Sequence, residues 1–309
     1  VIARQMEYKP NIFSQMLRGS SSREIGIIAP SITNPFYAQL ISAAEQECLK
    51  RGYIPFICSS MGEPQLEMNH LDMLEDRCVA GILLSSMGQG EGIVKRLNEL
   101  RIPIMLFDQT LDSYEGDGIL FDFYQGAYLS TEYLIQCGHR DIVFCSGPIN
   151  RYSRRVMYEG YKQALKDYNL GISKKRLIGT IPEPDTYGEG EYQLGKALGQ
   201  MLLERDYLPD AIVTINDITA IGVINYLYSE GIQVPHDISI MGFDDISICE
   251  MVTPPLSTIH QPAFDTGKQA AKYLLDKIEG QITEPVHITM NPVLVERKSV
   301  RKIHRKVRR

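Results

Sequence analysis

The sequence has no long hydrophobic run. Across its 309 residues, no apolar stretch approaches the roughly 18 residues that a membrane-spanning helix requires. No signal peptide is recognisable either, because residues 1–22 are polar and basic and contain no apolar core. These absences argue against a membrane protein, and we expect the chain to act in the cytoplasm without a membrane partner.

Cysteine is present but lacks any pattern typical of a metal site or a disulfide framework. The six cysteines are scattered along the chain, with no C-x-x-C pair and no Cys/His spacing of the kind that binds zinc. The expected state is that of reduced, mostly buried thiols, as in cytosolic proteins. We predict neither a metal site nor a cofactor.

The sequence also lacks the usual motifs of enzymes. Gly88, Gly90 and Gly92 follow an expected strand but do not have the G-x-G-x-x-G spacing of a dinucleotide site. Neither a phosphate-binding G-x-x-x-x-G-K-[ST] loop nor a G-x-S-x-G nucleophile turn is present. His139 and His260 are expected to be structural. With no set of nucleophile, base and oxyanion donors, we predict that the protein is not an enzyme.

What the chain has instead is charge of opposite sign in different places. The net charge is −6, of which residues 1–23 contribute +3 and residues 297–309 contribute +8, leaving −17 for the residues between them. An acidic body with basic ends indicates contact with a polyanion at an end and not across the body. The final run, residues 301–309, is expected to be a solvated basic tail.

From residue 25 onwards one unit recurs: a short apolar strand, a turn and an amphipathic helix. A first series runs from Ile25 to about Gln136, and a second begins at Ile142 and ends with a β segment from His287 to Val295. This alternation predicts an α/β fold with parallel sheets. The number of units fits two doubly wound lobes.

Aromatic and polar residues follow several of these expected strands. Phe36 and Tyr37 stand on the turn after the first strand, and ligands of open α/β sheets bind beyond the carboxyl ends of the strands. Acids and amides in such places are Asp108, Asp122, Asn216, Asp217, Asp244 and Asp245. These groups suit the hydroxyls of a sugar-sized ligand, whereas helix capping is the alternative for Asp122, Asp217 and Asp245. We expect capping to prevail at Asp217 and Asp245.

Residues 1–23 differ from the body and predict a short isolated helix. Residues 8–11 form a turn around Pro10, Asn11 is a suitable N-cap, and the helix is expected to end near Leu17, before a serine-rich linker. A helix of this length is unstable alone in water and needs a partner. From these residues alone, a DNA-contacting helix and a frayed basic tail stay equally open.

Several stretches of the sequence resemble blocks of one protein family. They are EYKPNIFSQMLRGSSSREIGII (7–28), IGIIAPSITNPFY (25–37), CGHRDIVFCSGP (137–148), VPHDISIMGFDD (234–245), TPPLSTIHQP (253–262) and PVLVERKS (292–299). In this order and at this spacing they resemble the lactose-repressor/galactose-repressor family of bacterial transcription regulators. The resemblance implies a periplasmic-binding-protein-like type I core of two lobes, joined by three crossovers and preceded by a hinge helix. Most of a helix-turn-helix headpiece is then expected upstream of Val1.

The resemblance also implies a division of the chain. Residues 1–23 would be the end of the headpiece, the hinge helix and a linker. Residues 24–123 plus 257–287 would form the N-terminal lobe of the effector core, and residues 124–256 plus 288–300 the C-terminal lobe, followed by the basic tail at 301–309. The three crossovers are expected near residues 123–125, 255–259 and 285–291.

The family's site residues carry over to the positions that match. The implied effector-binding residues are Asn34, Phe36, Tyr37, Asp108, Asp122, Arg151, Ser153, Met157, Asn216, Asp244 and Gln261. The implied DNA-binding residues of the hinge are Tyr8, Lys9, Asn11, Ser14, Leu17 and Arg18. In the family, a leucine at the position of Leu17 wedges a base step in the minor groove.

Two positions depart from the family pattern. Met157 stands where many members have an arginine that grips the ligand, which weakens the case for a simple hexose as effector. The nearby Arg151, Arg154 and Arg155 offer substitutes for that arginine. Phe123 stands where asparagine is commoner and is expected either to narrow the cleft or to pack at the crossover.

Together these features predict a homodimeric transcription regulator, a repressor, whose affinity for operator DNA is controlled by a small polar effector. That effector, a sugar or sugar derivative, would bind between the lobes, change their closure and melt the marginal hinge helix. A protein co-regulator in place of a sugar stays open. One alternative is a sugar-binding receptor of a transport system, which an upstream signal peptide would favour. Another is an enzyme that uses the cleft carboxylates, for which the sequence offers no nucleophile.

Overall fold

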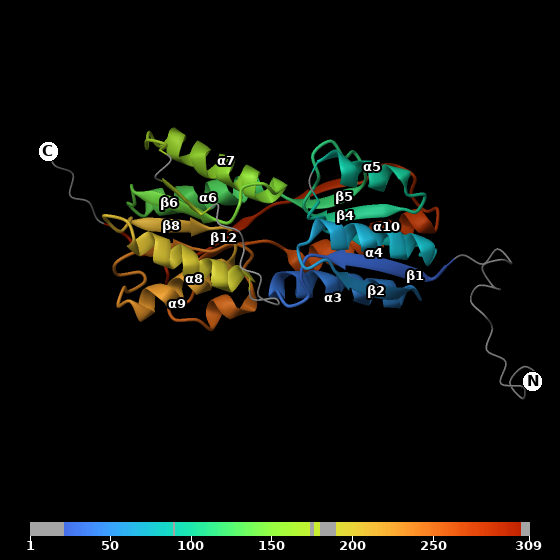
Figure 1. Ribbon diagram of the computed structural model, residues 1–309, viewed down its shortest axis with the longest axis horizontal. Coiled ribbons are helices and arrows are strands. Elements are labelled where there is room, and N and C mark those ends of the chain that lie inside the picture. The colour runs from blue at the N-terminus through green and yellow to red at the C-terminus, as the bar shows by residue number, and fades with distance from the viewer. Residues whose placement is uncertain (1–21, 89, 174–175, 180–189, 304–309) are drawn as a thin grey trace, which may run out of the picture.

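The computed structural model describes residues 22–88, 90–173, 176–179 and 190–303. Two α/β lobes lie side by side along the long axis of the molecule, and each consists of a parallel sheet with helices on both faces (Figure 1). The α/β fold with two doubly wound lobes, predicted from the alternation of strands and helices, is therefore confirmed.

The first lobe contains a six-stranded sheet in which every pair of neighbours is parallel. Its strands, in spatial order, are β11 (His287–Met290), β5 (Gly118–Phe121), β4 (Ile104–Asp108), β3 (Gly81–Leu84), β1 (Glu24–Ala29) and β2 (Ile54–Ser59). One face is covered by α3 (Pro35–Lys50) and α10 (Ala263–Ile278), and the other by α4 (Pro64–Asp76) and α5 (Glu91–Glu99). Successive side chains of β1 therefore enter different cores, Ile27 on the side of α3 and Ile28 on the side of α4.

The second lobe contains a four-stranded parallel sheet. Its strands, in spatial order, are β7 (Leu177–Gly179), β6 (Ile142–Ser146), β8 (Ala211–Thr214) and β9 (Ser239–Met241). Two helix pairs flank it, α6 (Phe123–Gln136) with α7 (Tyr152–Asp167), and α8 (Gly190–Leu203) with α9 (Asp217–Ser229) (Figure 1). An antiparallel pair of short strands, β10 (Thr258–His260) and β12 (Val293–Val295), and a 3-10 helix, η2 (Ser247–Glu250), belong to the same lobe.

The chain passes between the lobes three times: at Asp122 between β5 and α6, after His260 between β10 and α10, and after Met290 between β11 and β12. The β segment predicted for residues 287–295 is thus two strands in different lobes. β11 pairs with β5 along its whole length, so the lobe boundary predicted after residue 287 falls inside a strand of the first sheet.

The second passage also lies later than expected. Ser257 and His260 form bridges with Met241 and Asp244, and β10 pairs with β12. Residues 257–260, predicted to belong to the N-terminal lobe, are therefore bonded to the second lobe. The apolar pattern could not reveal this, because a short strand looks the same in either sheet.

Part of the predicted molecule lies outside the described residues. This holds for the hinge residues Tyr8, Lys9, Asn11, Ser14, Leu17 and Arg18 and for residues 304–309 of the basic tail. Within the described ranges, no helix is long and apolar enough to cross a membrane, and no group of three His, Cys, Asp or Glu side chains could hold a metal ion. All six cysteines are free thiols, and five of them are buried.

Candidate functional site

Asp108 is the last residue of β4, and the carboxyl ends of the strands of this first sheet face the second lobe. Its φ of +78° lies in the left-handed region, which a residue other than glycine adopts only when its surroundings hold it there. The hydroxyls of Tyr37 and Ser85 both donate to its Oδ2, each at 3.1 Å. The residue is 3% exposed. A buried carboxyl group is thereby fixed at the strand ends together with two hydroxyls.

The pKa of Asp108 depends on charged groups of both lobes. Burial raises the pKa of Asp108 to about 7, because the charged carboxylate loses its hydration. The hydrogen bonds that it accepts and the charge of Arg151 lower this pKa, whereas the charge of Glu191 raises it. Burial also raises the pKa of the Tyr37 hydroxyl, and the carboxylates of Asp108, Glu191 and Asp244 raise it further. Groups from both lobes therefore act on the same few atoms.

Asp244 is the corresponding carboxyl group of the second lobe. It follows β9 with a φ of +115°, and its N–H donates to the carbonyl oxygen of Ile259 at 2.8 Å. Its Oδ1 accepts from Nε2 of Gln261 at 2.8 Å. Burial raises the pKa of Asp244 well above the usual range, the charge of Asp217 raises it further, and the bond from Gln261 lowers it. Two predicted effector residues, Asp244 and Gln261, are thus in direct contact.

Asn34 connects the lobes and caps a helix at the same time. Its Oδ1 accepts from the N–H of Phe36 at 2.9 Å at the start of α3, and its Nδ2 donates to Oε2 of Glu191 at 2.7 Å. Glu191 lies in the first turn of α8 and was missed by the sequence analysis. An acid in a first helical turn is common on protein surfaces, so its sequence position gave no signal that it contacts the other lobe.

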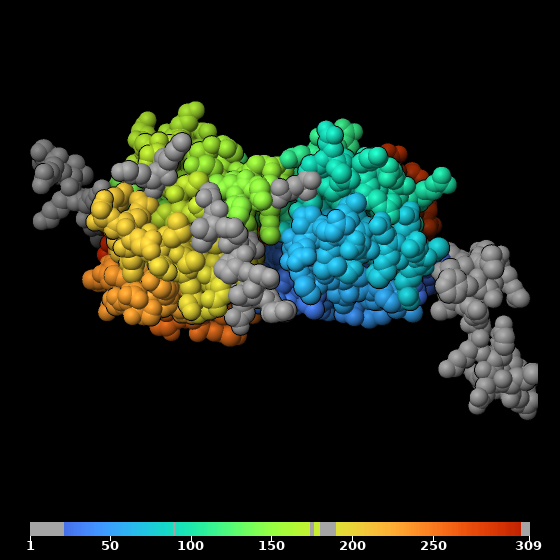
Figure 2. All heavy atoms as spheres, in the orientation of Figure 1, coloured from blue at the N-terminus to red at the C-terminus, as the bar shows by residue number. Residues whose placement is uncertain are grey.

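Further contacts between the lobes come from the start of α7. Nη2 of Arg155 forms an ion pair with Oδ2 of Asp112 at 2.5 Å. Arg151 also lies close to the first lobe, because its Nη2 is 3.4 Å from the position that a Cβ on Gly62 would occupy. Beside the ion pair, a hollow of about 210 Å³ is lined by Gly88, Gly90, Leu111, Asp112, Asn150, Tyr152 and Arg155. Figure 2 shows the lobes meeting along a boundary that runs across the long axis.

Two of the predicted effector residues are packed into the core. Phe36 is 4% exposed and its ring lies against that of Phe121, with 5.6 Å between centroids. Met157 is 2% exposed and belongs to the same apolar cluster. Ser153 lies in the first turn of α7 and is partly buried. Of the two aromatic residues, Tyr37 is therefore the one that donates to Asp108, and the ring of Phe36 packs edge-to-face against it with 5.1 Å between centroids.

Two other predicted effector residues act as helix caps. Oδ1 of Asp122 accepts from the N–H of Gln125 at 2.8 Å and caps α6, which is the alternative that the sequence left open. Oδ1 of Asn216 accepts from the N–H of Thr219 at 2.9 Å and caps α9. Each of these bonds satisfies a backbone donor that has no partner within its helix.

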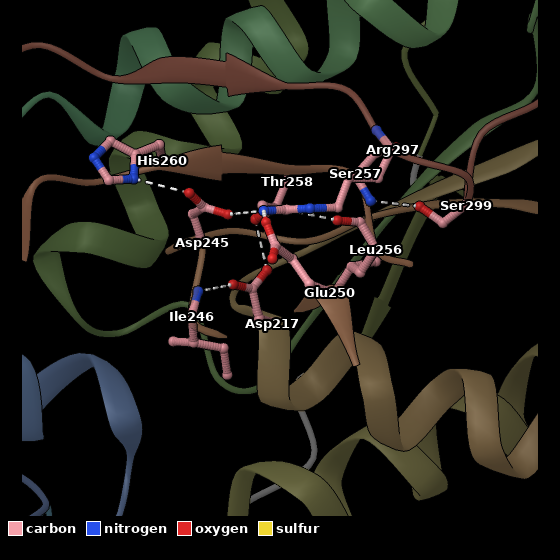
Figure 3. Close-up of polar contacts among 10 residues, drawn as sticks. All are labelled: Asp217, Asp245, Ile246, Glu250, Leu256, Ser257, Thr258, His260, Arg297 and Ser299. Atoms are coloured by element: carbon pink, nitrogen blue, oxygen red, sulfur yellow. Dashed lines mark hydrogen bonds and ion pairs between the residues drawn. The ribbon is translucent and has the colours of Figure 1, made fainter. Parts of the chain in front are cut away.

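Asp217 does not cap a helix, contrary to expectation. It lies one residue inside α9, where it is buried, because Asn216 takes the capping position. Its Oδ2 accepts from the N–H of Ile246 at 2.9 Å and its Oδ1 from the hydroxyl of Thr258 at 2.6 Å (Figure 3). Asp217 thus ties the start of α9 to β10 and to the loop that carries Asp244.

Asp245 is not a cap either. Its Oδ2 lies 2.9 Å from Nδ1 of His260 and its Oδ1 lies 2.7 Å from Nη2 of Arg297 (Figure 3). Burial acts to raise the pKa of Asp245, but the bonds to His260 and Arg297 outweigh it and hold the pKa below the usual value. The same hydrogen bond raises the pKa of His260. These side chains hold the Asp244 loop against β10 and the C-terminal segment.

Comparison with known proteins gives relatives along almost the entire chain. A family model described as a periplasmic binding protein-like domain matches residues 131–300. The HTH-type transcriptional repressor PurR of Actinobacillus pleuropneumoniae serotype 3 (strain JL03) is 32% identical over 305 residues, which cover 97% of this chain and 88% of that protein.

Two solved structures of transcription regulators are also similar to this chain. A LacI family transcriptional regulator from Enterococcus faecium with bound ribose is 29% identical, covers 91% of this chain and 100% of its own, and superposes with a TM-score of 0.77. The transcription regulator CcpA of Lactococcus lactis, 23% identical with the same coverage, superposes with a TM-score of 0.81 and shows the common fold.

The chain belongs to the lactose-repressor/galactose-repressor (LacI/GalR) family of transcription regulators. The resemblance that its sequence blocks indicated is therefore confirmed. The relatives are regulators and not enzymes.

Proposed function

We propose that the chain is a DNA-binding transcriptional repressor whose operator affinity is controlled by a small polar effector bound between the lobes. The observation that carries this proposal is the hydrogen bond from Asn34 of the first lobe to Glu191 of the second, near the bonded pair Tyr37 and Asp108. The charges of Arg151 and Glu191 from the second lobe act on the pKa of Asp108. Hydroxyl, carboxyl and guanidinium groups at strand ends are suited to a polar ligand. A ligand that touches both lobes stabilises one degree of closure over another.

The nature of the effector is part of the proposal. The similar regulator from Enterococcus faecium holds ribose, which supports a sugar or sugar derivative here. The buried Met157, in place of the arginine of many family members, argues for a ligand that differs from a simple hexose. A sugar-binding receptor of a transport system is the weaker alternative. The relative that is 32% identical is a transcriptional repressor, and the alignment covers 88% of its length.

We further propose that two copies pair and present their hinges to DNA in the cytoplasm. Support comes from β2, an edge strand of the first sheet, where Ile54 and Ile57 are 57% and 45% exposed. Met61, just beyond it, is 71% exposed. Apolar side chains on an open strand edge are typical of a surface that a partner covers. In such a dimer the hinge helices would carry Leu17 into the minor groove at the centre of the operator.

Immunoprecipitation of the protein, expressed from its own gene in the host bacterium, followed by sequencing of the bound DNA, tests the function. We expect a small number of enriched sites that share a pseudo-palindromic sequence and lie upstream of genes, because a symmetric dimer reads a symmetric operator. Expression of those genes should rise when the gene is deleted. Enrichment of no DNA above the background would contradict the proposal, and lowered expression would contradict repression in favour of activation.

A further inference from the structure

One carboxylate of the first lobe is buried on the inner face of a helix. Glu67 lies in the first turn of α4 and is 0% exposed. Leu71 and Leu74, further along the same helix, are equally buried and belong to the apolar core between α4 and the sheet. The spacing of these three residues follows the apolar stripe of an amphipathic helix, so Glu67 occupies a position where an apolar side chain is expected.

The Glu67 carboxylate is held by hydrogen bonds and not by a positive charge. Its Oε1 accepts from the hydroxyl of Ser86 at 2.5 Å, and its Oε2 accepts from the N–H of Met87 at 2.7 Å. Among the described residues, no cation is bonded to it. Burial raises the pKa of Glu67, whereas these hydrogen bonds lower it. A buried carboxylate needs such donors to replace its hydration, so Glu67 and the residues that donate to it are fixed relative to each other.

The segment that Glu67 holds is residues 85–88, which follow β3. Within this segment, Oγ of Ser86 also accepts from the N–H of Gly88 at 3.1 Å. The thioether of Met87 accepts from Nε2 of Gln109, the residue after Asp108, at 3.5 Å. The side chains that precede Gly88 are all buried, namely Ser85, Ser86 and Met87. The segment is therefore bonded to α4 and also to the residues that follow β4.

The same segment contributes to the site between the lobes. The hydroxyl of Ser85 donates to Oδ2 of Asp108 at 3.1 Å, and Gly88 lines the hollow beside the ion pair of Asp112 with Arg155. Hydrogen bonds between two oxygen atoms are commonly about 2.7–2.8 Å long. The bond from Ser85 is longer than this, so a small shift of the segment would weaken it.

We propose that Glu67 is a positioning residue of the effector site: its carboxylate holds residues 85–88 so that the hydroxyl of Ser85 donates to Asp108. This inference rests on the proposed effector site between the lobes. It deepens that proposal by naming a residue of α4 that acts on the site through Ser85, without contact with the ligand.

A double-mutant cycle on the whole chain tests the proposal. Glu67→Gln keeps the size of the side chain but has a single acceptor oxygen, so its NH2 group must face one of the two groups that donate to the carboxylate. The segment should then shift, and the bond from Ser85 to Asp108 should weaken. Ser85→Ala removes this bond directly, and the double variant Glu67→Gln/Ser85→Ala completes the cycle.

The readout is the titration of the Asp108 carboxyl carbon, followed by carbon-13 NMR and assigned with Asp108→Asn. The hydrogen bond from Ser85 lowers the pKa of Asp108, so Ser85→Ala and Glu67→Gln should each raise it, by about 0.5–1 pH unit. In the Ser85→Ala background, Glu67→Gln should have no further effect, because the connection through Ser85 is gone. The other groups that act on this pKa are the same in every variant, namely Tyr37, Arg151 and Glu191.

Two further variants separate positioning from general stability. Glu63→Gln makes the same substitution one turn earlier, at an exposed position whose side chain forms no capping bond, and should leave the titration of Asp108 unchanged. Ser86→Ala keeps the charge of Glu67 but removes one of its donors, so it should raise the pKa of Asp108 even if Glu67→Gln does not fold. A merely structural role of Glu67 would lower the unfolding temperature and leave this titration unmoved.

The proposal is overturned if Glu67→Gln and Ser86→Ala leave the titration of Asp108 unchanged. It is also overturned if Glu67→Gln raises the pKa as much in the Ser85→Ala background as in the wild type. The DNA immunoprecipitation decides the proposed function separately. Enriched operator sites with an unmoved titration would remove the role of Glu67 and keep the regulator, whereas a raised pKa without enriched DNA would keep the positioning of Asp108 and contradict the regulator.

Discussion

Asp108 is held in a buried place because hydroxyl groups replace part of its hydration. Tyr37 and Ser85 donate to the same oxygen, and the strand end fixes the backbone in a left-handed conformation. Because its pKa is about 7, the carboxyl group can either accept or donate a hydrogen bond near neutral pH. A residue with these properties is costly for stability and is therefore a good candidate for ligand contact.

Replacing Asp108 by Asn should make stability less dependent on pH. In the unfolded chain this carboxyl group loses its proton near about pH 4, whereas in the folded protein it does so near pH 7. Between these values the folded state binds more protons, so the free energy of unfolding of the wild type falls as the pH rises. The free energy of unfolding of the variant should therefore rise relative to that of the wild type by on the order of 2–4 kcal/mol between about pH 4 and pH 8.

Urea unfolding of both proteins at several pH values measures this difference. The control is Asp72→Asn, which removes a carboxylate from an ion pair on the exposed surface of α4 and should leave the pH dependence almost unchanged. Parallel stability curves for the wild type and Asp108→Asn would show that the pKa of Asp108 is not raised.

The sequence could not show which of two neighbouring residues, Asn216 or Asp217, caps α9. Both Asn216 and Asp217 follow β8 and both types cap helices well, yet Asn216 caps α9 and Asp217 is buried in contact with Thr258 and Ile246. The helix start differs by a single residue between the two interpretations. Residue preferences at helix ends do not fix a boundary to that precision, and only the long-range bonds of Asp217 do.

Among the elements, the crossing of α8 and α9 depends on glycine. A Cβ at Gly222 would lie 2.3 Å from the carbonyl oxygen of Tyr192, and a Cβ at Gly195 would lie 2.2 Å from that of Thr219. The backbones of the two helices therefore approach each other closely, and the space for side chains is absent. This packing holds the first turn of α8 in place, and with it Glu191, which accepts a hydrogen bond from Asn34 of the first lobe.

Gly222→Ala should therefore destabilise the protein by about 1–3 kcal/mol, because the helices must separate to admit the methyl group. Gly92→Ala in α5 is the matched control, since a Cβ there meets no atom within 4 Å and alanine favours the helix by up to about 1 kcal/mol. The midpoint of urea unfolding gives both values. Equal stability of the two variants would contradict the close packing of α8 on α9.

The elements themselves were largely predictable, and their partners were not. Strands such as residues 25–29 and 104–107 are buried apolar runs, and the helices between them have regular apolar faces, so type and order follow from local pattern. The pairing of β11 with β5 and of β12 with β10 depends on contacts far apart in the sequence. For the same reason Asp108 and Asp244 could be placed at strand ends in advance, whereas the contact of Glu191 with Asn34 could not.

In the molecule as a whole, an aromatic column runs through the first crossover. The rings of Phe36, Phe121, Phe123 and Phe243 follow one another at centroid distances of 5.6, 6.1 and 6.0 Å. Phe123 is 6% exposed and stacks on Phe243 with 17° between the ring planes. Of the two expectations for Phe123, packing at the crossover is the one observed. The column and the bonds Asn34–Glu191 and Asp112–Arg155 connect the lobes at several points.

A ligand bound between the lobes, as proposed above, would add to these connections. The most direct test is a thermal unfolding screen of the wild type and Asp244→Asn against sugars, sugar derivatives, amines, nucleosides and purines. A compound at a hundred times its dissociation constant should add about 2.7 kcal/mol to the stability of the wild type. We expect that at least one such compound stabilises the wild type and that its effect is lost in Asp244→Asn. An equal shift in both proteins would place the ligand away from Asp244 and contradict an effector site between the lobes.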